Sequence, residues 1–73
     1  QRRAAGLEQE LRHSRERQEA LEVELAALQA QAQAGDSSEL RRELQEVTAQ
    51  LSDEKLKSMA LEQALQRFAA QRR

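Results

Sequence analysis

The chain has 73 residues, of which 34% are charged, 38% are hydrophobic and one, Phe68, is aromatic. A chain so short and so poor in large apolar side chains cannot build the enclosed core of an enzyme, so we predict no catalytic residues. It has no cysteine and a single histidine, His13. This composition excludes a thiolate zinc site and predicts neither a metal nor another cofactor.

Acidic and basic residues are nearly balanced, at 13 and 12, and the two signs are interleaved along the chain. Without a basic stripe, nucleic acid is not an expected partner. No apolar run approaches the roughly 20 residues needed to cross a bilayer, so no membrane insertion is expected. The lack of cysteine and of a secretion signal favours a cytoplasmic location. A first residue other than Met and an arginine pair at each end indicate a segment of a longer protein.

Residues 1–34 predict a first helix, because apolar residues recur at alternating steps of three and four. Seven of the nine positions on this stripe are apolar, and Ser14 and Gln18 are the exceptions. We call these positions the first half of the seam. They are Ala4, Leu7, Leu11, Ser14, Gln18, Leu21, Leu25, Leu28 and Ala32.

Residues 35–38 predict a hinge or kink with a helix cap. Gly35 is the residue type that often follows a helix end, and Asp36 with Glu39 has the form of a capping box. The seam also loses its phase here, since a straight helix would rotate it by roughly 120° between Leu28 and Leu40. The alternative is one continuous helix that tolerates the glycine at a cost of about 1 kcal/mol.

Residues 39–73 predict a second helix with the same alternation, in which the polar exceptions are Glu54 and Ser58. Together the two halves predict an all-α, heptad coiled coil with a break near Gly35. The second half of the seam is Leu40, Leu44, Val47, Leu51, Glu54, Ser58, Leu61, Leu65 and Phe68.

Charges beside the seam favour a parallel homodimer. In that arrangement four attractive pairs form between chains, each worth about 0.2 to 1 kcal/mol. They are Arg3 with Glu8, Glu10 with Arg15, Arg17 with Glu22, and Lys57 with Glu62. The dimer would be about 110 Å long if extended, at about 1.5 Å per residue. Its apolar seam would consist of Leu7, Leu11, Leu21, Leu25, Leu28, Leu40, Leu44, Val47, Leu51, Leu61, Leu65 and Phe68.

An antiparallel hairpin folded at the glycine is the second architecture. If residues whose numbers add to 72 face each other, the polar exceptions coincide, with Ser14 opposite Ser58 and Gln18 opposite Glu54. The parallel dimer instead places Glu54 opposite Glu54 of the second chain, and the repulsion between the two carboxylates disfavours that dimer. The flanking charges in turn oppose the hairpin, because they predict three repulsive pairs. Those pairs are Glu8 with Glu62, Arg15 with Lys55, and Arg17 with Lys57.

The stretch from Ser52 to Met59 is the candidate binding surface. Its seam residues are polar, whereas Leu56 and Met59 point away from the seam, so a partner could dock on Leu56, Met59 and Lys55. The alternative is an ordinary weak spot that gives a long coiled coil flexibility. His13, between Arg12 and Arg15, is expected to be exposed and to have no site role.

These leucine heptads, set in Glu, Gln, Arg and Ala, resemble the rods of long coiled-coil scaffold proteins of the cytoskeleton, centrosome, cell junctions and Golgi tethers. The resemblance covers the whole chain and implies dimerisation and the organisation of protein partners in the cytoplasm, without a cofactor. We therefore predict an oligomerisation and spacing segment of a scaffold protein. The alternative is a helical hairpin that binds a partner protein, including as a four-helix bundle made with a second hairpin.

Overall fold

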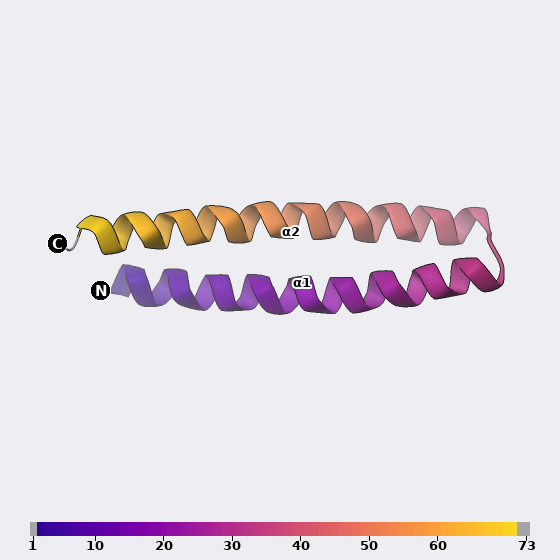
Figure 1. Ribbon diagram of the computed structural model, residues 1–73, viewed down its shortest axis with the longest axis horizontal. Helices are drawn as coiled ribbons and strands as arrows, with labels where there is room; N and C mark the ends of the chain where they lie inside the picture. The colour runs from indigo at the N-terminus through magenta and orange to yellow at the C-terminus, as the bar shows by residue number, and fades with distance from the viewer. Residues whose placement is uncertain (1, 72–73) are drawn as a thin grey trace.

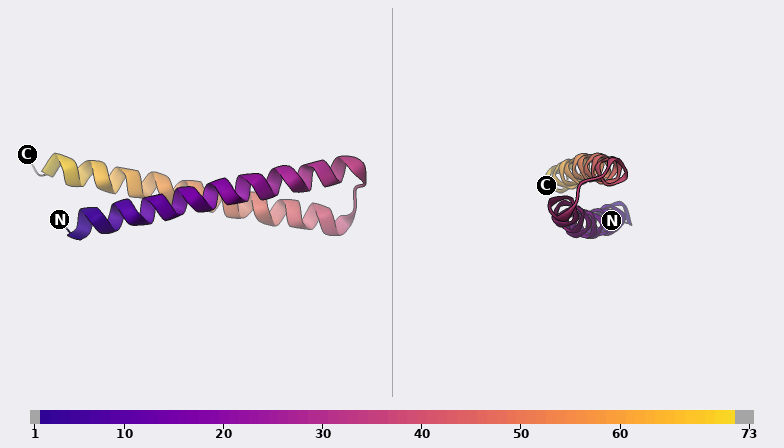
Figure 2. Two further views of the ribbon diagram at one scale, coloured as in Figure 1. Left: turned by 90° about the horizontal axis from the view of Figure 1, so that it is seen from below. Right: turned by 90° about the vertical axis from the view of Figure 1, so that its right-hand side faces the viewer.

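One chain folds into a helical hairpin in the computed structural model, which describes residues 2–71 and the side chains of residues 4–71. Helix α1 spans Arg2–Ala34 and helix α2 spans Ser38–Gln71. The two run antiparallel, so the start of α1 and the end of α2 lie at the same end of the molecule (Figure 1). The helices cross at a shallow angle (Figure 2), and the Cα atoms extend over 56 × 14 × 14 Å.

The seam residues lie along the contact between α1 and α2. All eighteen predicted seam positions are buried or half-buried, and among the other described side chains only Glu62 and Ala64 are not exposed. The other positions of each helix carry mostly charged, amide and small side chains, with Val23, Leu56 and Met59 as the large exceptions, so this stripe is the most apolar face that either helix can bury. The seam is therefore filled within one chain.

The most continuous apolar packing lies in the half of the hairpin next to the turn. Leu28, Leu40 and Val47 form a buried cluster, and Val47 is only 5% exposed. Four partly buried residues pack against this cluster, namely Leu21, Leu25, Ala32 and Leu44. The open half has fewer large side chains in its seam, so the turn half contributes most of the apolar burial.

Residues 35–37 form the turn, and Ser37 caps α2. Its hydroxyl accepts a hydrogen bond from the Leu40 N–H at 3.1 Å, and its carbonyl accepts one from the Arg41 N–H at 3.0 Å. Ser37 thus takes the N-cap place predicted for Asp36 in a capping box with Glu39, and α2 begins at Ser38, one residue before the predicted bound. The Asp36 carboxylate instead binds the Arg41 guanidinium, with Nε at 3.0 Å and Nη2 at 2.8 Å.

Gly35 does not act through the left-handed conformation that makes glycine common after helices. No described residue has a positive φ, and a Cβ built on Gly35 would meet no atom within 4 Å. Its N–H continues the helical pattern by donating to the Gln31 carbonyl at 2.9 Å. The glycine thus marks the break without being sterically required there.

The structure is a helical hairpin, the second of the two predicted architectures, whereas the flanking charges favoured the parallel homodimer. Both arrangements use the same seam, so one chain cannot form both at once. The charge argument against the hairpin depended on three repulsive pairs, but two residues of those pairs, Arg15 and Arg17, bind carboxylates across the hairpin.

Candidate functional site

A polar network interrupts the apolar seam near the middle of the hairpin. At its centre is Ser14, whose side chain is fully buried, at 0% exposed. The Ser14 hydroxyl donates to Glu54 Oε2 at 2.5 Å and lies 3.3 Å from the Glu54 carbonyl oxygen. A buried hydroxyl is stable only when it is hydrogen-bonded, so α1 and α2 are tied together at this level.

The Arg17 guanidinium binds the same carboxylate, that of Glu54. Its Nε donates to Glu54 Oε1 at 3.0 Å and its Nη2 to Oε2 at 3.2 Å, a forked contact that suits a guanidinium. The Glu54 side chain is only 14% exposed. The hydrogen bonds from Arg17, and secondly from Ser14, lower the pKa of Glu54, although partial burial opposes them. Glu54 is therefore held as a carboxylate.

Gln18 and Ser58 complete the network one layer away. The Gln18 amide donates to the Ser58 hydroxyl at 2.7 Å, and that hydroxyl donates to the Lys55 carbonyl at 3.0 Å. The register had placed Ser14 opposite Ser58 and Gln18 opposite Glu54, whereas the bonds run diagonally. Each serine hydroxyl binds the longer side chain of the neighbouring layer, Ser14 that of Glu54 and Ser58 that of Gln18. No buried polar side-chain atom in the described part lacks a partner.

Arg15 forms a second ion pair between the helices, with Glu62, through Nη2 and Oε2 at 2.5 Å. Arg15 and Arg17, for which lysine neighbours were predicted, thus both bind carboxylates across the hairpin. Helical side chains lean toward the N-terminus of their own helix. In an antiparallel pair this favours residues whose numbers add to more than the register value, as with Arg15 and Glu62 at 77 against 72, whereas Arg17 and Glu54 add to 71.

The other residues predicted to pair between chains are not joined in the hairpin. Glu8, Glu10, Glu22 and Lys57 form no ion pair among the described side chains, and the Arg3 side chain lies outside them. The repulsion predicted between Glu8 and Glu62 does not hold Glu62 away from the interface, since its carboxylate binds Arg15. The hairpin thus uses three of the eight predicted charges in two new pairs, Arg15 with Glu62 and Arg17 with Glu54.

The predicted partner surface is exposed on the outside of α2. Leu56 is 66% exposed and Met59 is 54% exposed, and Lys55 beside them is exposed as well. On α1, Val23 is the corresponding large exposed apolar residue, at 71%. None of these side chains contributes to the seam.

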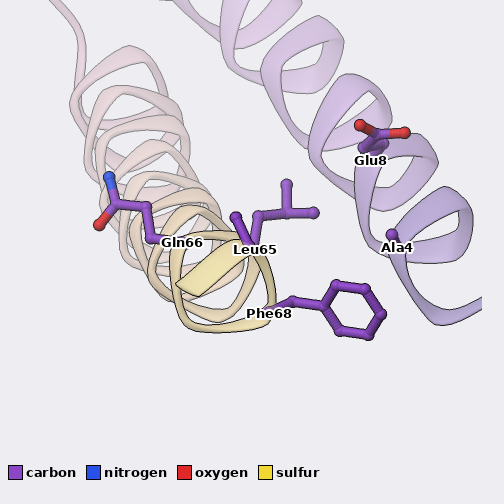
Figure 3. Close-up of a pocket in the computed structure, with 6 residues that line it drawn as sticks. Ala4, Glu8, Leu65, Gln66 and Phe68 are labelled. Carbon is purple, nitrogen blue, oxygen red and sulfur yellow. The ribbon is translucent and has the colours of Figure 1, made fainter. Parts of the chain in front are cut away.

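A shallow hollow lies at the open end of the hairpin. Leu65 and Phe68 point from α2 toward α1, where the small side chain of Ala4 faces them (Figure 3). Glu8 and Gln66 line its rim. The hollow exists because alanine is too small to fill the layer opposite Phe68, and it brings together no pair of groups suited to acid–base chemistry.

Other site types find no support in the described residues. The described residues include no group of three or more His, Cys, Asp or Glu placed to hold a metal ion. Neither described helix has an apolar stretch long enough to cross a membrane. His13 is exposed on α1, with Nδ1 at 3.5 Å from Glu16 Oε1.

Comparison with known proteins gives no relative from which a role could be transferred. No protein family, curated protein or solved structure matches the chain. The candidate site is therefore defined by geometry alone, as the polar network of Ser14, Arg17, Gln18, Glu54 and Ser58, which we call the central network.

Proposed function

We propose that the chain is a non-enzymatic structural module, an antiparallel coiled-coil hairpin that serves as a rigid protein-binding and spacing element. Each helix is about 50 Å long at 1.5 Å per residue, so the hairpin reverses the chain and holds its two ends side by side. The observation that carries this proposal is the central network, which joins α1 to α2 through hydrogen bonds specific to one register.

The central network supports the antiparallel arrangement because it would be lost in the parallel one. In a parallel, in-register pair, Glu54 would face Glu54 of the other chain, and the Ser14 hydroxyl would lose its carboxylate acceptor. Breaking a buried charge contact in this way is strongly unfavourable. Polar residues at seam positions are well-attested devices for fixing register and orientation at some cost in stability.

The same geometry argues against catalysis. Glu54 is the most enclosed carboxylate in the described interface, and its partners keep it ionised. A general acid or base working near neutral pH needs the opposite change, a raised carboxyl pKa, and a bound substrate within reach. An arginine and a serine already occupy the positions from which a substrate would approach Glu54.

The second candidate function is the dimerisation segment of a scaffold protein, built as a parallel homodimer. It is favoured by the four attractive pairs predicted between chains. Three residues of those pairs, Glu10, Glu22 and Lys57, form no ion pair in the described hairpin that would compete. Arg15 and Arg17 would have to exchange Glu62 and Glu54 for Glu10 and Glu22. The resemblance to cytoplasmic scaffold rods suits either candidate.

Cysteine pairing in dilute solution distinguishes the two. We expect the double variant Ser14→Cys with Ser58→Cys to close a disulfide within one chain and to keep the mass of a monomer. A control pair, Ser14→Cys with Ser38→Cys, should stay reduced because Ser38 lies at the turn. A disulfide between two copies of the single variant Ser14→Cys would overturn the hairpin in favour of the parallel homodimer.

A further inference from the structure

The outer face of α2 carries a second stripe with the spacing of a helix interface. Eight positions recur at steps of three and four, and none is charged although 34% of the chain is. All eight are exposed in the hairpin. We call them the outer stripe, and they are Gln45, Ala49, Ser52, Leu56, Met59, Gln63, Gln66 and Ala70.

The outer stripe has an apolar centre and small or amide residues on both sides of it. Leu56 and Met59, three residues apart, lie on one turn of the helix surface and are 66% and 54% exposed. A single exposed leucine is ordinary, but two adjacent large apolar side chains in an uncharged stripe suit contact with another helix.

We propose that the outer stripe binds the outer stripe of a second copy of this chain in the antiparallel direction. The two-fold axis passes between Leu56 and Met59, so residues whose numbers add to 115 face each other. Leu56 then packs on Met59 of the partner subunit, and Ser52 lies opposite Gln63 of the partner subunit. This inference builds on the proposed hairpin and names its partner.

The charges beside the outer stripe are complementary in this arrangement. On one side Lys55 approaches Glu62 of the partner subunit, and on the other Asp53 approaches Arg67 of the partner subunit. The residue numbers of these pairs add to 117 and 120, which lie above 115 in the direction that helical side chains lean. The excess for Asp53 with Arg67 equals that of the observed Arg15–Glu62 pair, 77 against 72.

Each of these contacts occurs twice because the interface is two-fold symmetric. A parallel pairing of the same stripes is less complementary, since it leaves one attractive pair type, Glu62 with Arg67, in place of two. Lys55, Asp53 and Arg67 form no ion pair within the described part of the hairpin, so they are available for these contacts, and Glu62 would be shared between Arg15 of its own chain and the second copy.

The exposed area of the hairpin also suits a second copy. Its accessible surface is 5861 Å², whereas a globular protein of 8.3 kDa exposes about 4,600 Å². The excess of roughly 1,300 Å² follows from the elongated shape of 56 × 14 × 14 Å, and it leaves room for the ~800 Å² that each partner buries in a standard interface. Since only Leu56 and Met59 are large, we expect a weak dimer that forms at concentrations of about 0.1 to 1 mM.

Disulfide formation between two chains that carry a cysteine at different positions tests the register of the dimer. We expect a Ser52→Cys chain mixed with a Gln63→Cys chain to give a covalent heterodimer. Either chain alone should give little, because identical positions would lie about 16 Å apart along the axis. A disulfide between two Ser52→Cys chains would show a parallel pairing and overturn the proposal, as would a monomeric mass at about 1 mM.

Matched variants test the surface. Leu56→Glu with Met59→Glu should abolish dimers, and the control Val23→Glu, on α1, should leave them unchanged. Asp53→Lys should weaken the dimer about threefold or more, and adding Arg67→Glu should restore it. A failure of Arg67→Glu to restore it would overturn the proposed register.

The Ser14→Cys and Ser58→Cys substitutions are also added to these surface variants, and formation of the disulfide within one chain is measured. If it forms while the intermolecular contacts fail, only the second-copy proposal is wrong. If it does not form in the parent background, the hairpin itself is wrong.

Discussion

Replacing Ser14 with alanine measures what the central network contributes to stability. Ser14 is fully buried, and its hydroxyl donates to a carboxylate at 2.5 Å. Hydrogen bonds to charged groups contribute about 1.5 to 3 kcal/mol net. We take the lower end, about 1.5 kcal/mol, because Glu54 keeps its two bonds to Arg17. Alanine recovers about 0.5 kcal/mol through its higher helix propensity.

The net loss in free energy of unfolding is then about 1 kcal/mol, which lowers the Tm of a chain of this size by about 4 to 8 °C. The matched control is Ser52→Ala, an exposed serine in α2 that gains propensity and loses no contact between helices, so its Tm should rise by about 2 to 4 °C. Thermal melts followed by far-UV circular dichroism at low micromolar concentration measure both. Equal shifts in the two variants would refute the claim that the Ser14 hydroxyl stabilises the hairpin.

The remaining predictions concern the turn and pH. Gly35→Ala should stabilise the hairpin by about 0.4 to 1 kcal/mol in urea unfolding, because the site has room and no positive φ; a clear loss would contradict the turn geometry. Ser37→Ala should cost about 1 kcal/mol as the loss of an N-cap, and Asp36→Ala clearly less. Acidification below about pH 5 should destabilise the chain, because the lowered pKa of Glu54 lets the unfolded state take up the proton first. Glu54→Gln should flatten this dependence, and an unchanged acid slope would show that Glu54 is not the group involved.

Which residues face the interface could be predicted from the sequence, because only one stripe of each helix is apolar. The meeting of the polar exceptions could be predicted too, since Ser14, Gln18, Glu54 and Ser58 bind one another across the hairpin, although not in the facing pairs expected. The position of the break followed from the phase change at Gly35.

Partner choice within the interface could not be predicted, because it depends on side-chain length and lean. Facing positions gave Arg15 a lysine neighbour, whereas the leaning side chains bring Arg15 to Glu62. Glu54 was treated as an unfavourable seam residue because the approach of Arg17 was not considered. These two contacts weaken the electrostatic argument against the hairpin, because both arginines have carboxylate partners within one chain.

The cap of α2 was misplaced by one residue for a similar reason. Asp36 and Ser37 are both good N-cap residues, and local sequence does not separate them. Arg41, one turn into α2, engages the Asp36 carboxylate and leaves Ser37 to cap the helix. Its position five residues after Asp36 was the available signal.

The distance between α1 and α2 within one chain tests the hairpin most directly. Spin labels on cysteines replacing His13 and Lys57, both exposed, can be measured by pulsed dipolar spectroscopy with the labelled chain diluted in unlabelled chain. The hairpin predicts a distance below about 30 Å, from helix axes 8 to 10 Å apart and two label tethers. An extended chain in a parallel dimer would place the labels about 66 Å apart, at about 1.5 Å per residue. That longer distance, or a short distance that vanishes on dilution with unlabelled chain, would contradict the hairpin.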